Sequence, residues 1–339
     1  MRRWIIGVFA CVLLGFGTQW LLDRLSDLEI PAGQGVSAHQ FGADGVTYAG
    51  TLILPNAVAD GPVALIVHGD GPQDRWGNAG YLPLINALVD RGIGVFTWDK
   101  PGVGGSTGNW LDQSFDRRIA ETVAAHSYLR DEVGIAADRL GFLGFSQAGW
   151  VVPAATQATT PRFTVLVGVA VNLREQGAYF TRRRLEREGM PPAQIPGAVA
   201  ANLAESDRAF AGGATGTLPT DMEPERAAFV RRIYDADASA DVEALQGPLL
   251  ALWGAEDLNV NAAKNAALYG TLAPRGEVAV LPHATHALLR AAHFNYQLVE
   301  QWPTAAMVRF ALMGRDAYAP GAIDRMANWI RAQTEGSLP

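Results

Sequence analysis

The stretch at residues 139–150, RLGFLGFSQAGW, is the most informative part of this sequence. A short apolar run ends at Gly144, Ser146 follows it closely, and small residues then lead into an apolar, helix-like segment. This is the layout of a strand, a very tight turn and a helix, which holds the serine in a strained backbone with its hydroxyl clear of the sheet. The neighbours have to be small because strand and helix nearly touch there. Ala148 stands where such motifs usually carry a glycine.

Composition and charge limit the classes of partner. The 339 residues are 49% apolar, so the chain can bury a large core. A net charge of −7 argues against a nucleic-acid partner, because no basic stripe is present to neutralise phosphates. Cys11 is the single cysteine, which excludes internal disulfides and a cysteine-based metal site.

The amino terminus is expected to lie outside the globular fold. Residues 4–22 carry no charge and are mostly apolar, and Arg2 and Arg3 precede them. This length is close to the roughly 20 residues that a helix needs to cross a bilayer. We expect residues 1–30 to be a membrane anchor or, alternatively, a cleaved signal segment. The arginine pair stays cytoplasmic, so the remainder would lie on the non-cytoplasmic (periplasmic or extracytoplasmic) side, or be secreted after cleavage.

Short, continuous apolar runs recur along the chain, at residues 62–68, 94–98, 140–144, 164–169, 249–253 and 277–281. Continuous hydrophobicity is typical of strands buried on both faces of a parallel sheet. Helix-like stretches lie between them, at residues 81–91, 117–133, 150–157 and 262–272. Before them, residues 36–41 and 46–54 flank a turn and predict an antiparallel hairpin. The pattern therefore predicts an α/β fold with a mostly parallel, doubly wound sheet.

One segment breaks this rhythm. Residues 172–246 contain no convincing strand and have a higher density of charge. We expect them to form a helical cap inserted into a core made of residues 31–171 and 247–339. In the tail of that core, residues 291–313 and 322–332 are expected to be helical.

Three residues follow apolar runs in the order that nucleophilic catalysis by serine requires: Ser146, Asp257 and His286. A serine hydroxyl is a poor nucleophile until a base removes its proton, and an acid usually orients that base. The order Ser, Asp, His along the chain is the one that accompanies this kind of serine turn. We therefore expect these residues to form a catalytic triad.

Two of these positions have a competitor nearby. Glu256 precedes Asp257, and we favour Asp257 because its shorter side chain lies one step deeper in the loop and fits the order Ser–Asp–His. His283 precedes His286, and we favour His286 as the base, with His283 as a loop residue.

A negatively charged tetrahedral intermediate also needs backbone N–H donors. The run at residues 62–67 ends in HGDGP, where glycines let the main chain approach a substrate. We expect one donor to be the amide of Asp70 or of its neighbour Gly69. The other donor is expected to be the amide of Gln147, directly after the serine.

Five ordered blocks resemble those of α/β-hydrolases: HGDGPQDRWGN (68–78), WDKPGVGGSTGNW (98–110), GFSQAGW (144–150), WGAEDLNV (253–260) and LPHATHALL (281–289). The sequence is most similar to the dienelactone-hydrolase-like, serine-aminopeptidase-like branch with a helical cap. The resemblance covers about residues 36–331 and implies an α/β-hydrolase fold with nucleophile, acid and base at Ser146, Asp257 and His286. The block containing Asp99 and Lys100 resembles a turn that braces the floor of the active site.

The expected chemistry is acyl transfer to water without a cofactor or a metal. A small or medium carboxylic ester is the first choice of substrate, because esterase is the commonest activity assigned to the group that the sequence resembles. An aminopeptidase or acyl-peptidase would need carboxylates in the cap to hold an ammonium, and Glu175, Glu205 and Asp207 are candidates. A thioesterase would need a basic site for a CoA phosphate, which residues 182–184 leave open. A membrane-tethered binding protein with a silent site is the alternative from another class.

Overall fold

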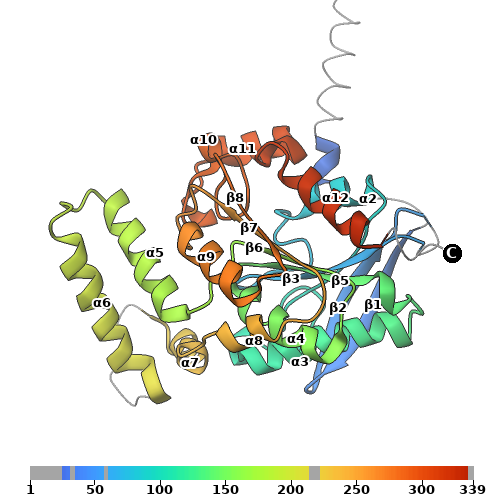
Figure 1. Ribbon diagram of the computed structural model, residues 1–339, viewed down its shortest axis with the longest axis horizontal. Helices are drawn as coiled ribbons and strands as arrows, with labels where there is room; N and C mark the ends of the chain where they lie inside the picture. The colour runs from blue at the N-terminus through green and yellow to red at the C-terminus, as the bar shows by residue number, and fades with distance from the viewer. Residues whose placement is uncertain (1–24, 31–34, 57–59, 214–221, 335–339) are drawn as a thin grey trace, which may run out of the picture.

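The structure is a computed structural model that describes residues 25–30, 35–56, 60–213 and 222–334. Its centre is an eight-stranded sheet in the order β1-β2-β4-β3-β5-β6-β7-β8 (Figure 1). β2 pairs antiparallel with β1 and β4, and the other neighbours pair in parallel. The strands are β1 (Val36–Ala43), β2 (Val46–Ile53), β3 (Val63–Val67), β4 (Gly94–Trp98), β5 (Leu140–Phe145), β6 (Thr164–Val167), β7 (Leu249–Gly254) and β8 (Glu277–Leu281). The predicted fold class, a mostly parallel sheet with an antiparallel start, is confirmed.

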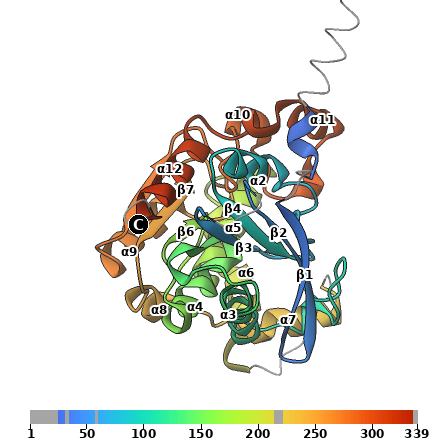
Figure 2. The same cartoon turned by 90° about the vertical axis from the view of Figure 1, so that its right-hand side faces the viewer.

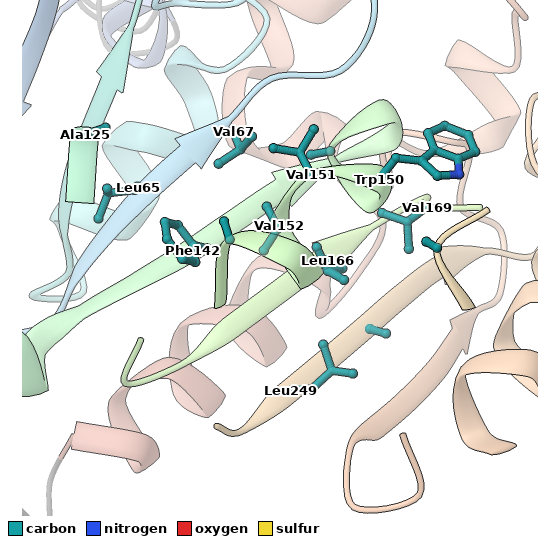
Figure 3. Packing of buried hydrophobic residues seen from close by; sticks show 14 of the residues in the cluster. Leu65, Val67, Ala125, Phe142, Trp150, Val151, Val152, Leu166, Val169 and Leu249 are labelled. Carbon is teal, nitrogen blue, oxygen red and sulfur yellow. The ribbon is translucent and has the colours of Figure 1, made fainter. Parts of the chain in front are cut away.

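The central parallel strands are buried on both faces, which explains their continuous apolar sequences. In β3, Leu65 and Val67 belong to the apolar cluster on one face, and Ala64 and Ile66 to the cluster on the other. Figure 3 shows part of the first cluster, with Phe142 of β5 beside a helix that follows β5. The first face is covered by α3 (Phe115–Asp131), α4 (Val152–Thr159) and α9 (Ala262–Leu272), and the second by α2 (Leu82–Val89) and α12 (Ala322–Thr334) (Figure 2).

The segment between β6 and β7 is helical, and most of it projects beside the sheet (Figure 1). It contains α5 (Leu173–Arg187), α6 (Ile195–Phe210), η5 (Ala211–Gly213), α7 (Pro224–Ile233) and α8 (Ser239–Glu243). Its two ends are tied together, because Asn172 and Asp237 form an antiparallel bridge and Asn172 Nδ2 donates to Asp237 Oδ2 at 2.9 Å. α8 packs on α4 and α9. The projecting part of the insertion therefore lies between these two bridged residues, whereas α8 belongs with the body.

The expectation of one continuous helix over residues 291–313 is wrong. The chain there forms α10 (Ala291–Phe294), then η6 (Val299–Gln301), and finally α11 (Thr304–Met313). Pro303 has an extended ψ of 156° and immediately precedes α11. Proline has no N–H to donate to a preceding turn and disfavours a helical residue before it, so a helix ends before this point and a new one begins after it. The predicted final helix is present as α12.

Residues 25–30, which we grouped with the N-terminal segment, lie against the body. They contain η1 (Ser26–Leu28), which contacts α2 and η7 (Gly314–Ala317). The Asp27 carboxylate accepts hydrogen bonds from Arg315 Nε at 2.9 Å and Nη2 at 2.5 Å, and Arg315 Nη1 also reaches Asp90 at 2.7 Å. In the described part of the chain, no helix is long and apolar enough to span a bilayer. The apolar run at residues 4–22 lies outside the described residues.

Candidate active site

Ser146 lies in the strained turn that its sequence predicts. β5 ends at Phe145, Ser146 has a φ of +51°, and η4 (Ser146–Trp150) follows directly. A positive φ is uncommon for a residue with a side chain and marks a turn that the surrounding structure holds in place. A Cβ at Gly149 would come 2.7 Å from Val169 Cβ, so that position has to be glycine. Ala148, at the usual glycine position, fits without exposure to solvent.

Asp257 and His286 form a hydrogen-bonded pair. Asp257 follows β7 and His286 follows β8, and His286 Nδ1 lies 2.8 Å from Asp257 Oδ2. The other carboxylate oxygen accepts the backbone amides of Asn259 at 2.7 Å and Val260 at 2.9 Å. An ionised carboxylate only accepts hydrogen bonds, so the ring carries its proton on Nδ1 and leaves Nε2 free to accept one.

Ser146 and the Asp257–His286 pair lie at the same edge of the sheet, because β5, β7 and β8 run in parallel. Gly168, just after β6, packs on the His286 ring: a Cβ there would come 2.9 Å from His286 Cε1. A Cβ at Gly69 would come 3.3 Å from Ser146 Cβ. Within the described residues, no hydrogen bond joins the Ser146 hydroxyl to the His286 ring. Hydrogen bonds between nucleophile and base are often long before substrate binds.

The two competing residues pair with each other instead. His283 Nδ1 lies 3.4 Å from Glu256 Oε1, and their side chains are 86% and 45% exposed. Asp257, by contrast, is buried. The structure therefore places Glu256 and His283 together at the solvent-facing surface, and brings Asp257 and His286 together beneath it.

Two effects act on the pKa of His286. Burial on its own would lower it, but the charge and hydrogen bond of Asp257 outweigh burial and raise the pKa above its usual 6.5. A base with a raised pKa stays protonated, and so inactive, to a higher pH.

We expect kcat/KM on a neutral ester to rise with pH through one ionisation whose midpoint lies above 6.5. In Asp257→Asn the midpoint of the residual activity should be lower, because burial then acts on the imidazole without the opposing carboxylate. The measurement is a pH–rate profile over about pH 5 to 9 for both proteins. Equal midpoints would show that Asp257 does not set the pKa of the catalytic base.

Two buried basic side chains hold the loop after β3 by its carbonyl groups. Lys100 Nζ donates to Gly69 O at 2.6 Å and to Gly71 O at 2.9 Å. Arg118 Nη2 donates to His68 O at 2.5 Å. In a trans peptide the C=O and the next N–H point in opposite directions, so the Asp70 amide is turned away from Lys100.

This arrangement distinguishes the two candidate amides of the loop. Burial raises the pKa of Tyr81, and the Gly69 amide, which lies beside the Tyr81 hydroxyl, opposes part of that rise. The amides of Asp70 and Gln147 have no acceptor among the described residues. Of the two alternatives, Asp70 is therefore the better placed to donate to an oxyanion together with Gln147.

Arg118 also binds the side chain of Gln147, the residue whose amide is the second candidate oxyanion donor. Its Nη1 donates to Gln147 Oε1 at 2.7 Å, so one guanidinium of α3 holds both the loop after β3 and the residue after Ser146. Glu121, one turn along α3, is buried and interacts with this charge. Burial raises the pKa of Glu121, and Arg118 acts against that rise. The sequence analysis did not single out Arg118 or Glu121; their only signal is an opposite-charge pair at i,i+3 on a helix.

The cap contacts the candidate site from two sides. Arg226 of α7 forms a two-pronged ion pair with the Asp70 carboxylate, at 3.0 and 2.5 Å, and lies over the Trp110 ring. Tyr179 of α5 donates its hydroxyl to Asp257 O at 2.9 Å. Nothing local in the sequence indicates the Arg226 contact, because its partner Asp70 lies 156 positions away.

The turn containing Asp99 and Lys100 braces the site floor as its sequence suggests. Asp99 is buried and accepts hydrogen bonds from Arg75 Nη2 at 2.5 Å and from the Gly105 amide at 2.8 Å. In the chain as described, no group of three or more His, Cys, Asp or Glu side chains is placed to hold a metal ion.

A family model described as serine aminopeptidase, S33, matches residues 62–291, which is more than half of the chain. The protein belongs to the S33 serine aminopeptidase family. In this S33 protein, the residues that match the family model begin at β3 and end at α10. The match therefore spans every residue of the candidate site. No curated protein matches the chain in sequence.

Solved structures similar to this S33 protein include esterases and a peptidase. An esterase from Pyrococcus furiosus is 16% identical, with a TM-score of 0.55 and coverage of 86% of this chain and 93% of its own. Est1E from Butyrivibrio proteoclasticus, solved with ferulic acid, is 15% identical, with a TM-score of 0.55 and coverage of 87% and 97%. A proline iminopeptidase from Mycobacterium smegmatis is 17% identical, with a TM-score of 0.55 and coverage of 89% and 100%. At these identities the likeness shows the α/β-hydrolase fold alone.

Proposed function

We propose that this protein is a serine hydrolase that cleaves a carboxylic ester through an acyl-enzyme intermediate. Ser146 attacks the carbonyl carbon, His286 Nε2 takes the hydroxyl proton, and Asp257 holds the ring by its Nδ1–H. The amides of Asp70 and Gln147 bind the oxyanion, each contributing ~3 kcal/mol of transition-state stabilisation. His286 then protonates the leaving alcohol and activates the water that releases the acid. The observation that carries the proposal is the 2.8 Å His286–Asp257 hydrogen bond at the sheet edge where Ser146 is strained.

The charges around the loop after β3 favour an ester over a substrate with a free amino terminus. Lys100 and Arg118 are buried against the carbonyl groups of this loop, and Arg226 closes over Asp70. An ammonium group brought beside the guanidinium groups of Arg118 and Arg226 would be repelled. Burial alone would raise the pKa of Asp70, but Arg226 lowers it, so this carboxylate is ionised and already paired.

The cap carboxylates considered for holding an ammonium have partners of their own. Asp207 binds Arg174 at 2.6 Å and accepts the Tyr234 hydroxyl at 2.8 Å. Glu175 pairs with Lys264 at 2.7 Å. These pairs support the ester over the aminopeptidase. The third cap carboxylate considered for holding an ammonium, Glu205, is exposed on α6.

The substrate class is tested by comparing p-nitrophenyl acyl esters, acyl-CoA thioesters and aminoacyl p-nitroanilides on the full chain. We expect kcat/KM to be highest on the esters, by about tenfold or more, because the guanidinium groups of Arg118 and Arg226 near Ser146 would repel a substrate ammonium. Arg183 and Arg184 are paired with Glu186 and Glu188 on the same helix. Turnover of anilides alone would identify an aminopeptidase and contradict the proposal.

Ser146→Ala is expected to lower kcat by about 10⁵-fold and to abolish covalent labelling by a fluorophosphonate probe. The matched control is Ser37→Ala, an exposed serine of β1, which should label like the wild type. A folded wild-type protein that is not labelled would support the alternative of a binding protein with a silent site.

We also propose that residues 4–22 anchor the protein in a membrane, with the enzyme body on the non-cytoplasmic side. The support is the uncharged apolar run after Arg2 and Arg3. A carboxyl-terminal reporter should be active only outside the cytoplasm, and the chain should sediment with membranes. Release of a shortened, soluble chain would instead identify a cleaved signal segment.

A further inference from the structure

The surface around α11 is unusually apolar for an exposed helix. α11 has the sequence TAAMVRFALM, and Ala306 is its one buried residue. Met307 is 50% exposed and Val308 is 52% exposed, while Val299, shortly before the helix, is 67% exposed. A single exposed apolar side chain is ordinary, but four of the six large apolar side chains that are exposed in the described structure fall within residues 298–308. We call Leu298, Val299, Met307 and Val308 the α11 face.

The α11 face lies at the end of the molecule where the described chain begins. In both views η1 is beside α11 (Figures 1 and 2). Asp27 of η1 is paired with Arg315, two residues after α11 ends, and a Cβ at Gly314 would come 2.5 Å from Asp27 Oδ2. The η1 segment is therefore fastened to the carboxyl end of α11.

This attachment limits how far α11 can be from the apolar run at residues 4–22. Asp27 lies five positions after Leu22, and an extended chain of five residue steps reaches at most about 18 Å. If the apolar run spans a bilayer, Asp27 is held within that distance of the membrane surface, and the carboxyl end of α11 is held beside Asp27. Such tethering gives the membrane surface a high effective concentration at the carboxyl end of α11.

We propose that the α11 face rests in the interfacial layer of the bilayer that residues 4–22 enter, a contact that rests on the anchoring proposed above. A helix that exposes apolar side chains on one side can lie in this layer with that side toward the acyl chains. Between residues 298 and 313 the charges are Glu300 and Arg309, one of each sign. The contact is therefore apolar and does not require anionic lipid.

The test uses the full chain with its single cysteine removed (Cys11→Ala) and reconstituted in phosphatidylcholine vesicles. A new cysteine carries a fluorophore either on the α11 face (Val308→Cys) or at the exposed turn between β1 and β2 (Asp44→Cys), the matched control. Lipids carrying a quencher in the upper acyl chain should quench the label at position 308 at least about twofold more than the label at position 44.

Flotation with the vesicles separates the two proposals. A chain that floats but shows equal quenching at both positions would overturn the α11 contact and leave the anchor intact. A chain that does not float would overturn the anchor, and the contact with it. Cross-linking between two Val308→Cys chains, with the label shielded from the lipid quencher, would assign this face to a dimer and also overturn the proposal.

Discussion

Asp257→Asn is expected to lower kcat by about 10⁴-fold while the protein stays folded. The asparagine oxygen can still accept the amides of Asn259 and Val260, which the Asp257 Oδ1 accepts now. Its NH₂ group then faces His286 Nδ1, where Asp257 Oδ2 stands at 2.8 Å. The ring has to turn Nδ1 into an acceptor and carry its proton on Nε2, so it can no longer take the proton of Ser146.

Glu256→Gln is the matched control, one residue earlier in the same loop. Its carboxylate is at the surface beside His283, so kcat should stay within about twofold of the wild type. Both variants are assayed on one p-nitrophenyl ester, with circular dichroism to check that they fold. A large loss in Glu256→Gln with little loss in Asp257→Asn would move the acid to Glu256 and contradict the triad.

Arg118→Met is expected to destabilise the protein by about 3 kcal/mol, because it leaves a buried carboxylate without its cation. The side chains of Arg118 and Glu121 are both buried, and Arg118 also holds His68 O and Gln147 Oε1. Burial raises the pKa of Glu121 and Arg118 opposes that rise, so without Arg118 this carboxyl binds a proton more readily. A carboxyl group whose pKa is raised by folding lowers the free energy of unfolding at high pH, and it lowers it less at low pH. The deficit should therefore shrink as the pH falls.

Urea unfolding near neutral pH and at a lower pH measures this effect. Arg117→Met, on the exposed side of the same helix, should change stability by no more than about 0.5 kcal/mol at either pH. The double variant Arg118→Met with Glu121→Gln should recover part of the loss, because the buried charge is gone while its hydrogen-bond acceptor remains. A deficit that the second substitution deepens would show that Arg118 acts through packing alone.

The parallel sheet was predictable because strands that are buried on both faces have continuously apolar sequences. Each strand from β3 onward is a short apolar run, as β3 shows with Leu65 on one face and Ile66 on the other. The candidate site residues follow such runs, so their shared edge could also be predicted. The choice of Asp257 over Glu256 could be made on side-chain length and position in the loop.

Contacts between distant segments could not be predicted in the same way. The sequence of α3 mixes charges with apolar residues, and nothing local indicates that Arg118 and Glu121 face inward. Arg226 meets Asp70 only because the insertion folds back over the sheet edge. The break before α11 had a visible cause in Pro303, but the apolar residues on both sides of it made the stretch resemble one helix.

Because Asn172 and Asp237 pair with each other, the chain leaves the body for the cap and returns to it at a single point. A foreign helical segment of any length could be grafted between these two residues without shifting the strands on either side. Such a chimera would keep Ser146, Asp257 and His286, but it would lose the Arg226 guanidinium that faces Asp70 and the Tyr179 hydroxyl that donates to Asp257 O. The grafted segment would therefore have to supply a positive charge where Arg226 now lies and a hydroxyl donor where Tyr179 now lies.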